Sequence, residues 1–284
     1  MHYNTRQEPT LVLGGTGKTG RRVVKRLAAR GLPVRIGSRS GEPRFDWEDR
    51  SSWDPVLEGV GSAYVCHYWD ALPGAAETLG SFAELAVQSG VSRLVLLSGR
   101  GEQEAERAER AVRDCGAELT VLRSTWFAQN FSEDYWREQV QAGEVALPAA
   151  DTPEPFVDAD DIADVAVAAL TDDRHVGELY ELTGPRLLTF AEAVAEISRA
   201  LGREIRYLPI SIEDFAAAAA GEQGVSSEVV ALLSFIFGEV LDGRNARLAD
   251  GVQRALGRQP RNFSDYARDA AATGIWNPTA TRAA

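Results

Sequence analysis

The segment Leu11-Val12-Leu13-Gly14-Gly15-Thr16-Gly17-Lys18-Thr19-Gly20 constrains the fold more than any other part of the sequence. Its glycines at positions 14, 17 and 20 come directly after a short apolar run and directly before an amphipathic stretch. In that context the spacing indicates a dinucleotide-binding turn. Gly14 permits a tight turn, Gly17 lets the backbone approach a pyrophosphate, and Gly20 lets the helix pack close to the strand. The N-terminus of that helix provides the anion site.

Two other interpretations of this loop are open. A glycine-rich turn can serve packing alone and bind nothing. The pair Lys18-Thr19 also suggests the phosphate-binding loop of nucleoside triphosphatases, whose first glycine stands five residues before the second. Here Gly14 stands only three residues before Gly17, so the sequence disfavours a triphosphate-binding loop.

Short β-branched runs alternate with amphipathic stretches over the first two thirds of the chain. Strands are expected over residues 10–13, 33–37, 62–67, 93–97 and 119–122, and helices over 21–29, 75–88 and 103–113. This alternation is typical of a parallel sheet with helices on both faces. The sequence therefore predicts an α/β fold with a Rossmann-type, doubly wound parallel sheet.

The pattern loosens beyond about Trp126, and three prolines between residues 148 and 155 mark a loop. A helix is expected from Asp160, and a capping box from Thr189 to Glu192 predicts a second helix over 190–200. A strand is expected over 205–210, and mostly helices follow. We therefore expect an NADP(H)-binding Rossmann domain over residues 1–150, which receives later segments, and a smaller, mostly helical substrate-binding lobe over 151–284.

The residues after the second expected strand bear on the choice of cofactor. An NAD-specific site places Asp or Glu there to bind the ribose 2′-hydroxyl, whereas this chain has Ser38-Arg39-Ser40. A guanidinium can hold a 2′-phosphate by paired charge-assisted hydrogen bonds, and the two hydroxyls can add donors. We therefore expect NADP(H) as the cofactor. A solvated surface arginine is the alternative interpretation of Arg39.

The segment Phe45-Asp46-Trp47 falls where the third strand of such a domain is expected to end. In that position Asp46 would accept a hydrogen bond from the adenine amino group, with Trp47 beside the ring. A simple turn explains the segment equally well.

Composition argues against several classes of function. The net charge of −12 has no compensating basic block, so the overall field would repel a nucleic-acid backbone. No apolar run approaches the roughly 20 residues of a membrane span, and the N-terminus lacks a signal-peptide pattern, so a cytoplasmic protein is expected. Cys66 and Cys115 have neither disulfide-framework nor metal-ligand spacing, and we interpret both as small buried apolar residues. No metal is expected.

Four segments carry a resemblance to a known family. They are the glycine loop, Gly37-Ser38-Arg39, Leu122-Arg123-Ser124-Thr125-Trp126-Phe127-Ala128-Gln129-Asn130-Phe131 and Phe156-Val157-Asp158-Ala159-Asp160-Asp161-Ile162-Ala163. Together they resemble the NmrA-like branch of the atypical short-chain dehydrogenases/reductases, and within it the ergot-alkaloid-type reductases and quinone reductase relatives. The rest of the chain is similar to the substrate lobe of that family only in length and helical character.

The resemblance implies residues for both the cofactor and the substrate. The implied cofactor residues are Gly14, Thr16, Gly17, Lys18, Thr19, Gly20, Ser38 and Arg39, with Asp46 and Ser98 as further members. The implied substrate residues are Trp126, Phe127 and Asn130. Trp126 and Phe127 are equally consistent with plain core aromatics.

Classical short-chain reductases protonate the substrate with a tyrosine whose pKa is lowered by a lysine four residues later. This chain has no lysine after Lys25, so the pair cannot exist. Tyr68, Ser98 and Arg100 follow expected strands closely and are the candidate catalytic proton donors, because such folds place ligands at the carboxyl ends of strands. Each is as consistent with a structural role.

Charged residues crowd the expected helix after Arg100. They are Glu102, Glu104, Glu106, Arg107, Glu109 and Arg110. We interpret them as a solvated helix face with i,i+4 pairs such as Glu106 with Arg110.

Two functions are consistent with these features. The first is an NADPH-dependent reductase that transfers hydride to an acceptor needing little acid catalysis, such as a quinone, a quinoid tautomer, a conjugated ketone or an iminium. The second is an NADP(H)-sensing regulatory protein that acts through a protein partner. In either case we expect a monomer or a homodimer.

The aromatic residues near the expected pocket favour the reductase, because they suit a flat polycyclic substrate. These residues are Tyr64, His67, Tyr68, Trp69, Trp126, Phe127, Tyr135 and Trp136. Arginine in place of lysine and alanine-rich helices hint at a GC-rich genome, which favours secondary metabolism and antibiotic biosynthesis. The expected partner is therefore a small aromatic molecule, with neither nucleic acid nor membrane.

Overall fold

The computed structural model describes residues 8–67, 70, 72–134, 136–220 and 227–278. The chain forms two compact units, each assembled from separate segments. Unit 1 contains Met1–Ser124, Ala159–Leu182 and Asp250–Arg258, and unit 2 contains Thr125–Asp158, Thr183–Ala249 and Gln259–Ala284. Within the described ranges, no helix is both long and apolar enough to cross a bilayer.

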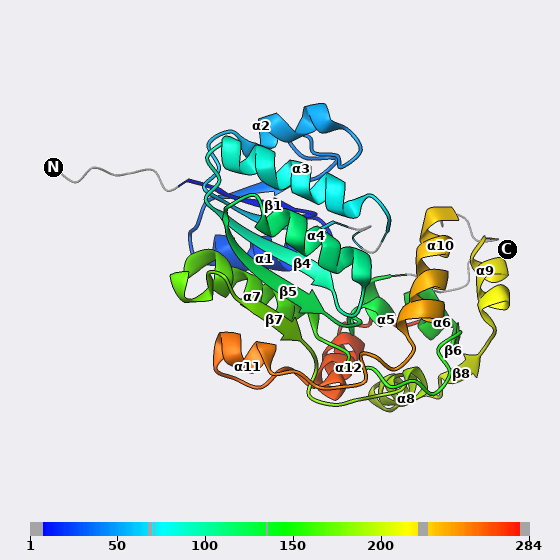
Figure 1. Ribbon diagram of the computed structural model, residues 1–284. Coiled ribbons are helices and arrows are strands. Elements are labelled where there is room, and N and C mark those ends of the chain that lie inside the picture. The colour runs from blue at the N-terminus through cyan, green and yellow to red at the C-terminus, as the bar shows by residue number, and fades with distance from the viewer. Residues whose placement is uncertain (1–7, 68–69, 71, 135, 221–226, 279–284) are drawn as a thin grey trace, which may run out of the picture. The chain divides into compact units, whose positions relative to one another are not determined.

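A six-stranded parallel sheet forms the centre of unit 1 (Figure 1). In spatial order its strands are β2 (Val34–Gly37), β1 (Thr10–Leu13), β3 (Ser62–Val65), β4 (Arg93–Gly99), β5 (Glu118–Ser124) and β7 (Leu179–Leu182). The helices of the unit are α1 (Gly20–Ala29), η1 (Arg50–Ser52), α2 (Trp53–Leu57), α3 (Ala75–Gln88), α4 (Gln103–Arg113), α7 (Ala159–Thr171), η2 (Asp173–His175) and α11 (Gly251–Leu256).

The order in which strands are added to the sheet reverses at β1. Strand β2 lies on one side of β1, and β3 lies on the other. Since strand–helix–strand connections are right-handed, segments that leave β1 in opposite directions place their helices on opposite faces. Accordingly α1 lies on one face together with α7, and α3 and α4 cover the other (Figure 1). Folds of this kind bind ligands at the carboxyl ends of the strands next to such a reversal.

The apolar run of β1 reflects burial on both faces. Leu11 and Leu13 pack in one core with Phe82 of α3 and Leu94 of β4. Val12 points to the opposite face by the alternation of a strand, and it is also fully buried. A strand covered on both sides needs apolar residues at every position, which is why the run does not alternate.

Unit 2 is built around aromatic side chains. Its helices are α5 (Asn130–Glu133), α6 (Trp136–Ala142), α8 (Phe190–Leu201), α9 (Ile212–Ala220), α10 (Ser227–Phe235), the π-helix η3 (Ile236–Val240) and α12 (Phe263–Ala272). Strands β6 (Glu144–Leu147) and β8 (Arg206–Pro209) form a small parallel sheet. The core includes Phe131, Phe190 and Trp276, and the Trp276 indole donates to the Phe131 carbonyl at 2.6 Å.

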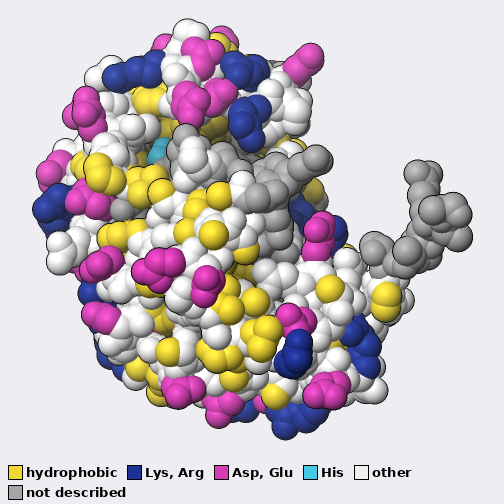
Figure 2. All heavy atoms as spheres, turned by 90° about the vertical axis from the view of Figure 1, so that its right-hand side faces the viewer, with side chains coloured by type: hydrophobic (Ala, Val, Ile, Leu, Met, Phe, Trp, Pro, Cys, Tyr) yellow, Lys and Arg dark blue, Asp and Glu magenta, His cyan; other side chains and the backbone are white. Residues whose placement is uncertain are grey.

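Some large apolar side chains of unit 2 remain exposed. Figure 2, which views the side that carries α9 and α10, shows apolar side chains among acidic and basic ones. Leu187, Phe235 and Leu248 are the most exposed large apolar side chains of this unit among the described residues.

The predicted α/β, doubly wound Rossmann-type fold is confirmed. The helices expected over 75–88 and 103–113 are α3 and α4 with the same ends. The strand expected over 93–97 continues to Gly99, and that over 119–122 extends in both directions to give β5. Both extensions arise because the β4–β5 ladder runs on until Gly99 pairs with Ser124. The capping box at Thr189 and Glu192 is also present at the start of α8.

Other expectations are corrected. No strand ends at residues 45–47; this segment is a loop in which Phe45 N–H donates to the Ser38 carbonyl at 2.9 Å. The sequence also did not predict β6 and β7, each only four residues long. The units do not divide at residue 150, because α5, α6 and β6 pack into the aromatic core of unit 2, which begins at Thr125.

Candidate functional site

The glycine loop between β1 and α1 makes the tight turn that the sequence predicts. Gly14 has a φ of 61°, which favours glycine, and its carbonyl accepts a hydrogen bond from Gly17 N–H at 2.8 Å. A Cβ on Gly20 would lie 2.1 Å from the Gly14 carbonyl oxygen, so only glycine lets α1 begin so close to the turn. Thr16 and Gly17 are exposed at the crest. The loop thus presents backbone at the N-terminus of a ten-residue helix, an arrangement suited to a pyrophosphate.

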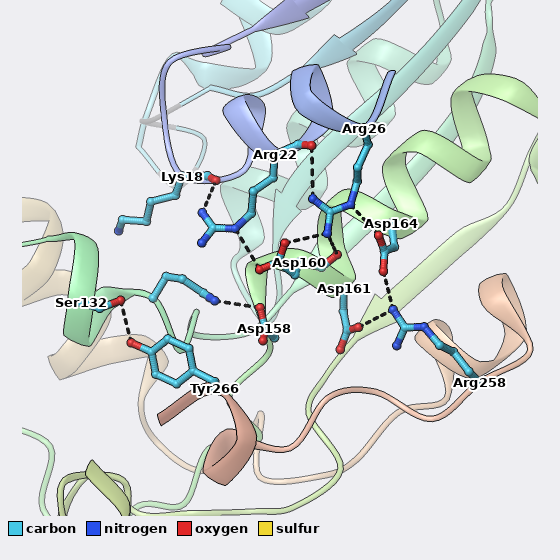
Figure 3. Close-up of polar contacts among 11 residues, drawn as sticks. Lys18, Arg22, Arg26, Ser132, Asp158, Asp160, Asp161, Asp164, Arg258 and Tyr266 are labelled. Carbon is cyan, nitrogen blue, oxygen red and sulfur yellow. Dashed lines mark hydrogen bonds and ion pairs between the residues drawn. The ribbon is translucent and has the colours of Figure 1, made fainter. Parts of the chain in front are cut away.

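Two side chains support this loop from within unit 1. The Tyr64 hydroxyl donates to Thr19 Oγ1 at 3.0 Å, and both residues are buried. Arg22 Nη1 donates to the Lys18 carbonyl at 2.8 Å (Figure 3). Burial raises the pKa of Tyr64 well above its ordinary value. Tyr64 therefore holds the loop and does not line a pocket as the sequence suggested. The Thr19 hydroxyl is bound to Tyr64, and the contact of Thr19 with a cofactor stays a prediction.

Ion pairs fix α1 to α7 (Figure 3). Arg26 binds Asp160 and Asp164, both at 2.6 Å, and Arg22 binds Asp160 at 3.2 Å. Arg258 pairs with Asp164 at 2.6 Å and with the fully buried Asp161 at 2.7 Å. Asp160, which belongs to the segment that carried the resemblance, and Asp164, just beyond that segment, therefore anchor the helix that begins at the glycine loop.

A pocket of about 560 Å³ opens beside the end of β2. Its lining includes Thr16, Ile36, Ser38, Ser40, Gly41 and Glu42. Ser38 Oγ and Ser40 Oγ lie 3.5 Å apart, and the Arg39 residue between them is exposed. The pocket thus joins the crest of the glycine loop to the hydroxyls expected to hold a 2′-phosphate. Glu42 places one carboxylate in the same lining.

Asp46 and Trp47 make contacts that do not require a ligand. The Asp46 carboxylate accepts from Arg44 Nη2 at 2.6 Å. The Trp47 indole packs edge-on against Phe45 and His67, with ring centroids 4.9 and 4.7 Å away, and donates to the Cys66 carbonyl at 3.3 Å. Their contact with an adenine ring stays a prediction.

The three candidate proton donors are Tyr68, Ser98 and Arg100. Tyr68 lies outside the described residues. Ser98 is buried and donates to Glu109 Oε1 at 2.7 Å, and Arg100 is buried and donates to Glu181 Oε2 at 3.1 Å. Their role as proton donors stays a prediction, but both side chains make hydrogen bonds inside unit 1. The reason is that the direction of a strand side chain is fixed by the pleat, which turns Ser98 under α4.

The charges of α4 also differ from the solvated face expected. Glu109 is 1% exposed and binds Arg123 of β5 through both carboxylate oxygens, at 2.7 and 2.6 Å. The hydrogen bonds with Glu109 raise the pKa of Arg123. Glu106 reaches Arg123 at 3.4 Å, not Arg110 as expected, because the arginine of the neighbouring strand lies under this face of the helix.

Two acidic residues lie at the end of β4: Asp70, which the sequence interpretation did not name, and Glu102, which it assigned to a solvated helix face. The Gly99 N–H donates to Asp70 Oδ2 at 3.1 Å. The Glu102 carboxyl group lies directly over Gly99, since a Cβ built there would be 2.4 Å from Glu102 Oε2. Burial and the charge of Asp70 raise the pKa of Glu102 to about 8. The glycines on either side of Arg100, at the end of β4, are the sequence feature that could have predicted a side chain packed against the backbone of this turn.

Cys66 and His67 follow β3 and are unreactive in character. Burial raises the pKa of the Cys66 thiol to about 12 and lowers the pKa of His67 to about 4. Cys66 is therefore a neutral thiol at pH 7, consistent with its interpretation as a small apolar residue, and the His67 imidazole is neutral as well.

The expected substrate residues all lie in unit 2. The half-buried Trp126 indole stacks on Trp136 with ring centroids 5.5 Å apart and an interplanar angle of 29°, and lies 5.0 Å from Phe237. Phe127 forms a backbone bridge with Val157. Asn130 opens α5 and is partly buried. Trp126 thus belongs to the core of unit 2 at one edge, and its contact with a substrate stays a prediction.

Comparison with known proteins places these features in a family. The family model described as "NmrA-like family" matches residues 105–266, more than half of the chain. The chain belongs to the NmrA-like family. The resemblance inferred from the sequence is therefore confirmed.

The chain is similar to several known proteins. Agroclavine dehydrogenase of Claviceps fusiformis is 30% identical over 91% of this chain and 96% of its own length. An NADPH-dependent quinone oxidoreductase of Escherichia coli, solved with NADPH, has a TM-score of 0.72 at 20% identity, covering 92% of this chain and 99% of the other. A negative transcriptional regulator, NmrA, solved with NADP, has a TM-score of 0.71 at 18% identity, covering 95% and 97%. These two structures share the fold.

Proposed function

We propose that this NmrA-like protein is an NADPH-dependent reductase that transfers hydride to a quinone, quinoid tautomer, conjugated ketone or iminium of a polycyclic aromatic secondary metabolite. The observation that carries the proposal is the pocket beside the glycine loop, where Ser38 and Ser40 flank an exposed arginine. Relatives named as an oxidoreductase and a dehydrogenase support an NAD(P)H-dependent oxidoreductase.

The residues of unit 1 fit a dinucleotide. A Cβ on Gly17 would meet only the Gly14 carbonyl oxygen, at 3.2 Å, so the rest of the space over this residue is open to a pyrophosphate. Ser38, Arg39 and Ser40 would hold a 2′-phosphate. The bound NADPH would supply the hydride, and the task left to the chain is to orient it and to provide a proton.

The substrate class rests on unit 2 and on the relatives. The half-buried indole of Trp126 in a stack of aromatic rings offers a flat apolar surface of the kind that binds polycyclic molecules. Agroclavine dehydrogenase and an NADPH-dependent quinone oxidoreductase are among the similar proteins, and their names denote alkaloid and quinone chemistry. These observations favour an aromatic acceptor.

The preference for NADPH is the first test. Titration followed by nicotinamide fluorescence should show NADPH binding at least about tenfold tighter than NADH, or about 1.4 kcal/mol. Arg39→Asp should erase or invert that preference, because a carboxylate repels the 2′-phosphate and can bind the 2′-hydroxyl. Equal affinities in the native protein would refute the assignment.

Glu42 supplies a complementary variant in the same pocket. Because its carboxylate lines the pocket, Glu42→Gln should tighten NADPH binding and leave NADH binding nearly unchanged. Turnover should then be followed as NADPH oxidation with a naphthoquinone, a hydroxyanthraquinone, a conjugated ketone and a cyclic iminium. Tight NADPH binding without turnover of any acceptor would favour the regulatory alternative.

A further inference from the structure

Reduction of a quinone or ketone by hydride also consumes a proton. A tyrosine–lysine pair cannot supply it, since no lysine follows Lys25. Ser98 and Arg100 are buried in contacts with Glu109 and Glu181. The carboxyl groups at the end of β4 are therefore candidate proton donors.

These acidic groups lie on the same edge of the sheet as the glycine loop. Strands β1, β3 and β4 are adjacent and parallel, so their carboxyl ends share one edge. Cys66, the first residue after β3, lies against the loop, because a Cβ on Gly14 would be 3.9 Å from Cys66 Cβ. Burial raises the pKa of the Cys66 thiol, the charge of Asp70 raises it further, and the charge of Lys18 lowers it. Asp70 is thus a neighbour of the loop expected to hold the dinucleotide.

Gly99 is what allows Glu102 to reach this edge. A Cβ there would lie 2.4 Å from Glu102 Oε2 and 2.6 Å from Oε1, so any side chain at this position would displace the carboxyl group. Glu102 is also the residue that precedes α4, yet its side chain makes no capping hydrogen bond to that helix. Its carboxyl group is therefore held at the strand end and not at the helix.

The two carboxyl groups lie at the same turn of the chain. Asp70 accepts a hydrogen bond from the Gly99 N–H at 3.1 Å, and the Glu102 carboxyl group lies over the same glycine. Burial and the charge of Asp70 raise the pKa of Glu102 to about 8. A carboxyl group whose pKa is raised in this way can give a proton at neutral pH.

We propose that Glu102 is the proton donor of the reduction, held over Gly99 beside Asp70. This inference rests on the proposed function. As hydride from NADPH brings two electrons and one hydrogen to a quinone, the O–H bond of Glu102 breaks and a new O–H bond forms on the quinone oxygen. The products are the hydroquinone and NADP⁺, and the Glu102 carboxylate regains its proton from solvent.

Two acceptors separate proton donation from hydride transfer. A naphthoquinone needs hydride and a proton, whereas an N-methylated dihydroisoquinolinium ion becomes a neutral amine on receiving hydride alone. Glu102→Gln should lower kcat with the naphthoquinone on the order of 100-fold, the low end of what a general acid contributes. It should leave kcat with the iminium ion and the affinity for NADPH within about twofold, because a general acid acts only on the proton-dependent step. Glu104→Gln, in the first turn of α4 and paired with Arg107, is the matched control and should match the native protein with both acceptors.

The pH profile gives a second readout. With the naphthoquinone, native kcat should fall above a break near pH 8, and Glu102→Gln should lack that break. Asp70→Asn should move the break to lower pH, because it removes the negative charge that keeps Glu102 protonated. A residue that served structure alone would not move the break.

The outcomes distinguish the proposals. Equal loss with both acceptors in Glu102→Gln would show a role in positioning, and no loss with the naphthoquinone would place the donor elsewhere. If the native protein reduces only the quinone, the pH profile tests the proposal. A break near pH 8 that moves to lower pH in Asp70→Asn supports Glu102 as the donor, and a break that does not move contradicts it. A native protein that reduces neither acceptor would overturn the proposed function itself, and Glu102 as its donor with it.

Discussion

At the scale of single residues, Gly17 separates folding from binding. A Cβ there would meet one carbonyl oxygen at 3.2 Å and otherwise open space. Gly17→Val should therefore keep the native circular dichroism spectrum but lose measurable NADPH binding in fluorescence titration, because the side chain occupies the space of the pyrophosphate.

A matched replacement controls for this change. Gly238 lies in η3 of unit 2 and is exposed, so Gly238→Val should retain the native affinity for NADPH. If Gly17→Val retained it as well, the dinucleotide would have to bind away from the glycine loop.

The residues of the glycine loop could be predicted because their backbone task follows from spacing alone. The orientation of Ser98 and Arg100 could not. Their partners, Glu109 and Glu181, stand 11 and 81 positions away along the chain. A residue type near a strand end suggests chemistry, but the pleat and the distant partner decide whether the group faces a ligand or the interior.

At the scale of elements, the Glu109–Arg123 pair joins α4 to the sheet. Glu109→Ala would leave Arg123 and Ser98 without their shared partner in a buried site, so unfolding in urea should show a loss of about 3 to 5 kcal/mol. The midpoint should move while the dependence on denaturant stays the same.

Glu106→Ala tests whether this loss is specific. Glu106 reaches the same arginine at 3.4 Å from a side chain that is 40% exposed, and such a contact contributes up to about 1 kcal/mol. Equal destabilisation by the two alanine variants would contradict the special role of the buried pair.

Elements with strong periodicity were predicted almost to the residue, as α3 and α4 show. Strand β7 escaped prediction because its four residues include Tyr180 and Glu181, and only its ladder to β5 makes it a strand. Strand β6 depends likewise on β8, which lies 62 residues later in register. Pairing between short, distant segments is a tertiary effect that local patterns do not contain.

At the scale of the whole molecule, Glu102 makes stability depend on pH. Its pKa of about 8 in the folded protein lies above the ordinary 4.5, so the folded protein retains a proton that the unfolded chain has lost between these values. Stability is therefore lost as pH rises from about 4.5 to 8. Glu102→Gln should melt at nearly the native temperature at pH 5 and above it at pH 8.

His67 acts in the opposite direction and serves as the internal check. Its pKa of about 4 in the folded protein lies below the ordinary 6.5, so its contribution is lost as pH falls below 6.5, equally in the native protein and in Glu102→Gln. A difference between the two melting curves that did not grow from pH 5 to pH 8 would contradict the raised pKa of Glu102.

The interleaved path of the chain has a consequence for biosynthesis. The sheet of unit 1 gains its edge strand β7 and the anchoring helix α7 only after the chain has passed through part of unit 2. Helix α11 then seats Gly251 so tightly on β7 that a Cβ there would lie 2.3 Å from the Glu181 carbonyl oxygen. During synthesis the ribosome must therefore release residue 258 before unit 1 can complete its fold. A premature stop at residue 150 would leave a fragment that contains the glycine loop but lacks α7, β7 and α11.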